Sequence, residues 1–204
     1  MNNLEKAMAG YVFKRGNEEL AKKRMRAKDL CFRYNSLLPS DSENRAKIID
    51  ELIGEHGMNC LITSPFYCDY GEFINAGDNF FLNYNCKILD GAKVVFGNDV
   101  LVGPDCTFVT PSHPLDPGQR LEGLEIFLPI TVGNNVWFGA GVTVLGGVTI
   151  GDNSVIAAGS VVTRDIPANC LAAGVPCRVI REVSEKDKEK YPFCPEQAAA
   201  ESDI

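Results

Sequence analysis

Between Val132 and Pro167 the chain reads VGNNVW, FGAGVT, VLGGVT, IGDNSV, IAAGSV and VTRDIP, six consecutive hexapeptides that share one pattern. The first position of every hexapeptide is apolar, and the second position is mostly glycine or another small residue. Neither an α-helix nor an ordinary strand has a six-residue period. The period is typical of a parallel β-helix, in which each hexapeptide forms one short strand and one turn. The sequence therefore predicts a mainly β fold built from hexapeptide repeats.

Three hexapeptides make one triangular coil of about 18 residues, and coils stack at the strand spacing of roughly 4.8 Å. The apolar first position points into the prism. Glycine, asparagine and aspartate gather in the turns, where left-handed backbone angles cost little. A meander of hairpins also alternates inward and outward side chains, but it would not keep one phase through six hexapeptides.

The same period continues upstream less regularly. Five apolar residues fall six apart, and three more follow after a ten-residue step, which implies a four-residue insertion near Asp90 to Lys93. Together the segments give roughly fourteen hexapeptides, or between four and five coils. The inward residues predicted by this phase are Ile62, Cys68, Ile74, Phe80, Cys86, Phe96, Val102 and Phe108.

The pattern disappears between Phe108 and Val132. This stretch contains four prolines and mixed charge, so residues 109–129 are predicted to leave the prism as a loop. A long excursion from a rigid scaffold often carries functional residues.

The N-terminal residues 1–58 are predicted to be helical. Asn17 is placed to cap a helix over residues 18–38. Asp41 or Ser42 is placed to cap a second helix over residues 43–55, which is expected to end near Gly54 or Gly57. Their apolar stripes are expected to cover the first coil, and in addition to form a wall of an acceptor pocket. The organisation we expect is a helical segment 1–58, a β-helix 59–183 and a C-terminal tail 184–204.

Composition narrows the functional classes. The net charge of −7 disfavours nucleic acid as a partner, and the sequence contains no apolar run long enough for a membrane span. The N-terminus is too polar for a signal peptide. The eight cysteines form no Cys-x-x-Cys pair, so we expect reduced thiols in a cytoplasmic protein, with a metal site or disulfides as the alternative.

The chain has two histidines. His56 lies at the end of the second predicted helix and is expected to be an ordinary surface residue. His113 begins the excursion, in Pro-Ser-His-Pro-Leu-Asp-Pro. Histidine is the side chain best suited to proton transfer near neutral pH, so His113 is a candidate catalytic residue.

Several further motifs occur together with these repeats. They are His113–Pro117, Gly123–Glu125, Asn135–Trp137, Gly147–Val155, Gly159–Thr163 and Ala173–Arg181. In this combination the chain resembles the sugar O-acetyltransferases, most closely the maltose and galactoside acetyltransferases, from about Met8 to Val183.

The resemblance implies a left-handed β-helix and a homotrimer with active sites between subunits. It also implies transfer of an acetyl group from acetyl-CoA to a sugar hydroxyl, without a covalent enzyme intermediate and without a metal. His113 would be the general base. Asn83 would bind near the reacting centre, and Glu125 would orient His113 or bind the sugar.

The remaining site residues follow from the same resemblance. Acceptor contacts are expected from Tyr11, Asn17, Asp69, Asn83 and Glu125, although relatives often carry aspartate where Asn17 stands. Coenzyme contacts are expected from Trp137, Gly139, Ala140, Ala158, Gly159, Thr163, Arg164, Arg178 and Arg181. Some relatives have serine where this chain has Ala140, which leaves a backbone N–H as the donor there.

Three other functions fit the sequence less well. A xenobiotic acetyltransferase of the streptogramin type would keep the chemistry and change the acceptor, but the helical N-terminus disfavours it. A metal hydratase like the γ-type carbonic anhydrases needs three histidine ligands, and the chain has two histidines. A non-catalytic β-helical sugar-binding scaffold would have no need of His113, Asn83 and the Arg178/Arg181 pair.

Overall fold

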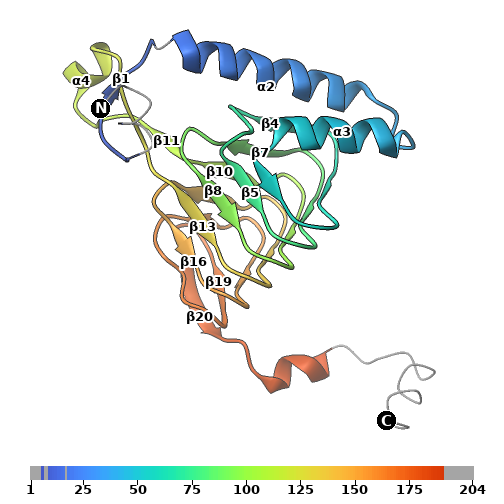
Figure 1. The fold of residues 1–204 in the computed structure, drawn as a ribbon. Helices are drawn as coiled ribbons and strands as arrows, with labels where there is room; N and C mark the ends of the chain where they lie inside the picture. Colours follow the sequence, from blue (N-terminus) through green and yellow to red (C-terminus); the bar gives the residue numbers. More distant parts are fainter. Residues whose placement is uncertain (1–5, 7–8, 17, 191–204) are drawn as a thin grey trace.

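The computed structural model describes residues 6, 9–16 and 18–190. They form a triangular column of stacked coils, with two helices across one end and the excursion at the side of that end (Figure 1).

The column has three walls, and each wall is a parallel sheet. The first wall contains β3 (Leu61–Ile62), β6 (Phe81–Leu82), β9 (Leu101–Val102), β14 (Trp137–Phe138), β17 (Val155–Ile156) and β19 (Cys170–Ala173). The second wall contains β4 (Phe66–Cys68), β7 (Cys86–Leu89), β10 (Thr107–Val109), β15 (Thr143–Leu145) and β18 (Val161–Val162). The third wall contains β2 (Glu55–His56), β5 (Ile74–Ala76), β8 (Val94–Phe96), β13 (Ile130–Val132) and β16 (Thr149–Ile150).

The chain always passes from the first wall to the second, then to the third, and back to the first. We call the turns between them the first corner (first to second wall), the second corner (second to third) and the third corner (third to first). The walls hold more strands than the predicted fourteen hexapeptides, because the repeat continues through β2 at one end and β19 at the other.

The inside of the column is a continuous apolar core. Phenylalanines from different walls meet along its axis: the ring centroids of Phe96 and Phe108 are 5.0 Å apart, and those of Phe108 and Phe138 are 5.3 Å apart. Both pairs are edge-on, the arrangement that aromatic quadrupoles favour. All three side chains are at most 2% exposed, so burial of these rings is a main source of the column's stability.

The predicted phase is confirmed for the last six hexapeptides, whose first positions are all buried in the core. Upstream it is wrong at Ile74, Phe80 and Cys86 and right again at Phe96, Val102 and Phe108, which are in register with the later hexapeptides. The residues in register with Cys68 and Ile62 of the first coil are Ile88 and Leu82, each two positions later than predicted. The predicted inward residues Ile74, Phe80 and Cys86 are nevertheless buried, since they face the core near the corners.

The cause lies at the second corner. The single four-residue insertion predicted near Asp90 is instead two extra residues at each of two successive turns, after Cys68 and after Ile88. Coils near the helices therefore repeat every 20 residues, whereas later coils repeat every 18 and then every 16. The excursion leaves the column at the same corner, in the coil that follows.

Asp90 holds the first of these wide turns. Its side chain is fully buried, and its carboxylate accepts hydrogen bonds from the backbone N–H groups of Asp69 and Tyr70, at 2.9 Å each, and of Phe73, at 3.4 Å. Burial raises the pKa of Asp90 to about 7, and the backbone N–H groups oppose that shift. A carboxylate in this position costs desolvation energy but supplies hydrogen-bond acceptors to three backbone N–H groups of the turn.

The third corner carries a ladder of side-chain amides. Asn59, Asn79 and Asp99 in three successive coils have φ of 56–58°, a region that asparagine and aspartate tolerate. Each asparagine donates to the next coil: Asn59 Nδ2 to Asn79 Oδ1 at 2.8 Å, and Asn79 Nδ2 to Asp99 Oδ1 at 2.8 Å. The ladder resumes at Asn135, which donates to Asn153 at 3.0 Å. It breaks between Asp99 and Asn135 because a carboxylate has no proton to donate.

Two helices cover the open end of the first coil. They are α2 (Glu18–Ser36) and α3 (Ser42–Leu52), close to the predicted ranges, and Asp41 caps α3. Their buried side chains, including Leu30, Tyr34 and Leu52, join the same core as the column. No helix in the described part of the chain is long and apolar enough to cross a membrane.

The prediction that His56 lies at the end of a helix is wrong, because His56 is in β2. The helix stops at Leu52, and Gly54 passes so close to the backbone of Glu72 that a Cβ there would lie 2.5 Å from its carbonyl oxygen. The chain then pairs with β5 as the first strand of the third wall.

The opposite end of the column is closed by a reversed strand. β20 (Arg178–Glu182) runs antiparallel to β19, whereas every other strand of that wall is parallel to its neighbours. The turn before β20 also covers the second wall, since Val161 N donates to Gly174 O and Cys177 N donates to Val161 O. The short helix η1 (Glu185–Lys190) follows.

Substituting Asp99→Asn is expected to complete the ladder, because the new amide can donate to Asn135 while still accepting from Asn79. We expect the free energy of unfolding to rise by about 0.5 kcal/mol, measured by urea denaturation. Asp105→Asn is the matched control. Asp105 also accepts from an asparagine, Asn85, and also has a positive φ, but the next coil presents Gly141, which has no side chain. An equal gain in both variants would contradict the ladder and indicate a net-charge effect.

Substituting Asp90→Asn is expected to change how stability depends on pH. Between about pH 4 and pH 7 the native carboxyl binds a proton that the unfolded chain has released, so wild-type stability falls as pH rises through this window. The variant has no such group. The difference between the unfolding free energies of the variant and the wild type should therefore rise with pH, by up to about 1.4 kcal/mol per pH unit. Urea titrations at a series of pH values measure this difference. Asp152→Asn, at an exposed corner, controls for removal of a charge, and parallel pH curves for wild type and Asp90→Asn would refute the assignment.

Candidate functional site

The excursion that carries His113 is an ordered structure rather than the loop that was predicted. It contains β11 (Pro111–Ser112), the short helix α4 (Pro117–Leu121) and β12 (Leu124–Phe127). β12 pairs antiparallel with β11 on one side and with β1 (Phe13–Lys14) on the other. The excursion is thereby tied to the N-terminal segment, and both lie beside the end of α2 (Figure 1).

The turn around His113 is held by its neighbours. Asp116 caps α4 by accepting from Gln119 N at 2.8 Å, and Arg120 donates to the carbonyl oxygens of Pro114 and Leu115 at 2.9 and 2.6 Å. The imidazole is exposed, and its Nδ1 lies 3.5 Å from the carbonyl oxygen of Leu124. A carbonyl only accepts, so this long contact favours the tautomer with the proton on Nδ1 and leaves Nε2 as the free acceptor.

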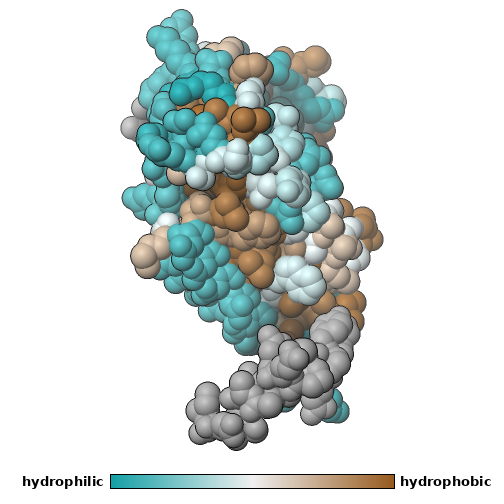
Figure 2. All heavy atoms as spheres, turned by 90° about the vertical axis from the view of Figure 1, so that its right-hand side faces the viewer, coloured by the Kyte–Doolittle hydropathy of each residue, from teal (hydrophilic) through white to brown (hydrophobic). Residues whose placement is uncertain are grey.

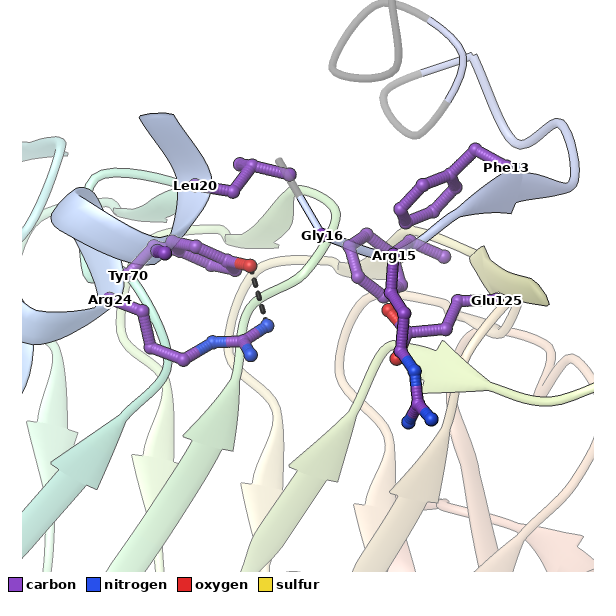
Figure 3. A pocket seen from close by; sticks show the side chains of 9 residues that line it. Phe13, Arg15, Gly16, Leu20, Arg24, Tyr70 and Glu125 are labelled. Carbon is purple, nitrogen blue, oxygen red and sulfur yellow. Dashed lines mark hydrogen bonds between the residues drawn. The ribbon is translucent and has the colours of Figure 1, made fainter. Parts of the chain in front are cut away.

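A pocket of about 300 Å³ lies between α2, β1 and β12. Figure 3 shows Arg24 entering it from α2, with Tyr70 beside it, and Arg15 and Glu125 on the opposite side. Phe13 and Phe127 form its apolar wall, with ring centroids 4.8 Å apart. A small apolar surface with a few convergent polar groups is typical of a site for a small molecule.

Arg24 is the best-connected group of this pocket. It donates to the hydroxyl of Tyr70 at 2.6 Å, and its guanidinium carbon lies 5.0 Å from the centroid of that ring. Its Nε is buried without a hydrogen-bond partner in the described residues and lies 3.7 Å from Asp69 Oδ1. Burial raises the pKa of Asp69, while Arg24 and Lys28 oppose that shift. Asp69 thus adjoins the pocket through Arg24 and Tyr70.

The structure brings only some of the predicted acceptor residues to the neighbourhood of His113. Glu125 extends into the pocket, and it is the carbonyl of Leu124, not the Glu125 side chain, that contacts the imidazole. Tyr11 is 60% exposed on the N-terminal segment. Asn17 lies outside the described residues. The sequence reasoning missed Arg15, Arg24 and Tyr70, although Tyr70 directly follows Asp69.

A second group of predicted residues lies at the first corner. Gly139 and Ala140 stack on Ala158 and Gly159 of the next coil, with Gly159 N donating to Ala140 O at 2.8 Å. A Cβ on Gly139 would lie 2.5 Å from Ala158 N, so only glycine fits there. Ala140, Ala158 and Gly159 are exposed, which gives this corner a flat surface with little side chain on it.

Asn83 belongs to the same corner, two coils nearer the helices. Its backbone N–H bonds to Val102 O, and its side-chain Oδ1 accepts from Tyr84 N at 2.8 Å. Its amide Nδ2 has no partner among the described residues and is the group available to a ligand. Trp137 stands on the first wall, 55% exposed.

The predicted cationic residues lie near the reversed strand. Arg178 is exposed, and its side chain donates to the carbonyl of Cys177 at 2.7 Å. Arg181 donates to both carboxylate oxygens of Asp187, at 2.6 and 2.8 Å, which raises its pKa. Thr163 and Arg164 are exposed at the second corner of the last coils. Arg178 is therefore freer than Arg181 to bind an anion.

Within one chain, the two groups of candidate residues lie at different corners. His113, Glu125 and Asp69 are at or beside the second corner, whereas Asn83, Gly139, Ala140, Ala158 and Gly159 are at the first. In the part of the chain that the structure describes, no group of three or more histidine, cysteine, aspartate or glutamate residues is placed to hold a metal ion.

Comparisons with known proteins agree on one family. Residues 6–57 match the family described as maltose acetyltransferase hexapeptide capping motif, and residues 129–164 match bacterial transferase hexapeptide (six repeats). The galactoside O-acetyltransferase of Escherichia coli (strain K12) is 46% identical over 187 residues, which cover 92% of this chain and 92% of that protein.

Solved structures give the same result. A galactoside acetyltransferase in complex with coenzyme A matches with a TM-score of 0.90 and 45% identity, covering 96% of this chain and 97% of that one. A maltose O-acetyltransferase from Clostridium difficile 630 matches with a TM-score of 0.88 and 41% identity, covering 91% and 99%. The column is accordingly a left-handed parallel β-helix, which confirms the predicted fold class. The chain is an acetyltransferase and belongs to the hexapeptide-repeat family of maltose and galactoside O-acetyltransferases.

Proposed function

We propose that this protein transfers an acetyl group from acetyl-CoA to a hydroxyl of a sugar, with His113 as the general base. The observation that carries the proposal is the exposed imidazole of His113 on the excursion whose β12 also supplies Glu125 to the pocket of Arg24 and Tyr70. Guanidinium, carboxylate and phenol groups around an aromatic wall suit the hydroxyls and the apolar face of one sugar ring. The relatives named for galactoside and maltose support the same acceptor class.

The proposed reaction is a direct attack. The acceptor oxygen bonds to the carbonyl carbon of the thioester while Nε2 of His113 takes the hydroxyl proton. The C–S bond then breaks, and His113 returns the proton to the departing thiolate of coenzyme A. A sugar hydroxyl is a very weak acid, so the base must act during the attack, and this role is worth roughly 10²–10⁴-fold.

The first corner is the proposed coenzyme site. Its small exposed residues, Ala140, Ala158 and Gly159, leave room for the narrow pantetheine arm, and Trp137 and Gly139 would lie near the thioester. Asn83 Nδ2 is proposed to donate to the oxyanion that forms in the transition state. Thr163, Arg164, Arg178 and Arg181 are the proposed partners of the nucleotide end, where Arg178 has the least competition from its own chain.

We propose a homotrimer with the site between subunits. The base and the coenzyme corner lie at different corners of one column, so a neighbouring chain is needed to bring them together. The first wall supports this assembly, because its outward residues in register are all apolar: Leu61, Phe81, Leu101, Trp137, Val155 and Leu171. Figure 2 shows a hydrophobic band along the column beside a hydrophilic strip. Threefold closure would bury such a band in every subunit.

The described cysteines support a reducing compartment, which we propose is the cytoplasm. All seven of them are free thiols, and most are buried in the core. Buried cysteine behaves there as a small apolar residue.

Replacing His113 by alanine is expected to reduce acetyl transfer at least about a hundredfold, because the proton acceptor is removed. Binding of coenzyme A, measured by calorimetry, should persist. The matched control is His56→Ala, the other histidine of the chain, which pairs with Asp50 at 2.9 Å in β2 and should keep its activity. Thiol release would be followed over glucosides, galactosides and amino sugars, and near-normal turnover of the His113 variant would remove it as the base.

Replacing Leu101 by aspartate is expected to dissociate the trimer into monomers and to abolish transfer with it. The side chain is 49% exposed in one chain, so the fold itself should survive, as circular dichroism would check. Light scattering after size exclusion measures the mass. Thr131→Asp, an outward position of the third wall, is the control and should remain assembled. A monomeric wild type, or a Leu101 variant that stays active, would contradict a site between subunits.

A further inference from the structure

Two cysteines that the proposed chemistry does not use face each other beneath α2. Cys31 is on α2, Cys68 ends β4, and their sulfur atoms are 3.7 Å apart. Both residues are buried, 3% and 7% exposed. The thiols of Cys86 and Cys106 also interact with each other, but each of them has in addition a backbone carbonyl oxygen as hydrogen-bond acceptor, at 3.3 and 3.2 Å. Cys31 and Cys68 instead belong to two separate elements, a helix and the first coil.

The pair is reachable from outside. A cavity of about 360 Å³ is lined by both cysteines together with Lys28, Phe32, Asn35 and Tyr67. Phe32 and Tyr67 are themselves 73% and 47% exposed, so the cavity opens to solvent beside them. Hydrogen peroxide is far smaller than this cavity, whose lining includes both cysteines.

The two thiols have different electrostatic surroundings. The hydrogen bond from Cys68 lowers the pKa of Cys31, and the same bond, followed by burial, raises the pKa of Cys68 well above its usual value. Asp90 and Asp69 face the pair from the second corner, and Lys28 faces the cavity from α2. With Cys68 as the hydrogen-bond donor, Cys31 is the sulfur that takes the thiolate form, which is the reactive form.

We propose that Cys31 and Cys68 form a redox-modification site, in which a two-electron oxidant of the peroxide class closes a disulfide between α2 and β4. The Cys31 thiolate attacks one peroxide oxygen, the O–O bond breaks, and the departing hydroxide takes a proton to leave as water. The Cys68 sulfur then attacks the resulting sulfenic acid, and its S–O bond breaks. The hydroxyl leaves as a second water with the Cys68 proton. Two thiols are oxidised and one peroxide is reduced.

The position of the pair links it to the acceptor pocket. Cys68 immediately precedes Asp69 and Tyr70, and α2 carries Arg24 about two helical turns before Cys31. A disulfide needs the sulfur atoms about 2.05 Å apart, so closure draws α2 and the start of the second corner together. This part of the inference rests on the proposed function: oxidation should alter the Michaelis constant for the acceptor and leave that for acetyl-CoA unchanged.

The primary experiment does not depend on activity. Reduced full-length protein is treated with hydrogen peroxide, free thiols are blocked with N-ethylmaleimide, and unreduced tryptic peptides are analysed by mass spectrometry. We expect a linked peptide pair containing Cys31 and Cys68, two hydrogens lighter than the separate peptides and lost on treatment with dithiothreitol. Persistence of both residues as maleimide adducts, or oxidation of Cys31 to the sulfinic acid without a link, would overturn the proposal.

Variants separate this site from general thiol oxidation. Cys31→Ser and Cys68→Ser should each abolish the link, while Cys60→Ser should retain it. Cys60 is partly accessible but lies in a different pocket, and burial raises its pKa to about 11. In a urea titration, the midpoint of the oxidised wild type should rise and that of oxidised Cys68→Ser should not. An equal rise in both would overturn the assignment.

Kinetics test the link to the pocket. The oxidised wild type should show at least a twofold change in acceptor Michaelis constant, reversed by dithiothreitol, and Cys68→Ser should show none. An unchanged constant in fully linked protein would overturn the coupling. If no sugar is a substrate, the proposed function fails, whereas the peptide link still decides the redox site by itself.

Discussion

Every coil of this column depends on residues that accept a left-handed backbone at the corners. In the part of the chain that the structure describes, the non-glycine residues with positive φ are all asparagine or aspartate, and each turns the chain from one wall to the next. Other side chains would pay a steric penalty at each such turn. Because these positions recur in every coil, their side chains stack, and at the third corner they hydrogen-bond from coil to coil. The turns therefore determine both the direction of the chain and the register of the walls.

The sequence predicts this part of the fold well, because one residue type per corner and one apolar residue per wall are enough to specify a hexapeptide coil. It failed upstream for a physical reason. Each wide turn at the second corner adds two residues, and a shift of two leaves the inward and outward alternation of a strand unchanged. Ile74, Phe80 and Cys86 are apolar and buried although they are not the residues in register with the first coil. The apolar pattern therefore could not reveal the two-residue shift. Asp90, fully buried in a wide turn, is the charged residue that marks the irregularity.

The candidate site was predictable to a different degree. Motifs identified His113, Asn83 and the residues of the first corner, since these belong to the repeats or follow them directly. The pocket of Arg15, Arg24 and Tyr70 was not predictable, because it forms where three distant segments meet: α2, the second corner and the β1–β12 pair. No period or spacing relates those segments. Likewise, the separation of His113 from the residues of the first corner becomes visible only when the strands are assigned to walls.

A stack of parallel coils resembles the core of a fibril, since each end exposes unpaired backbone groups to which another chain can add. In this protein one end is covered by α2 and α3. At the other end β20 runs in the opposite direction, and the turn before it occupies the edge of the second wall. A further parallel coil would find no matching edge on the first wall. The reversal of five residues thus blocks growth of the column along its axis, the direction in which filaments extend.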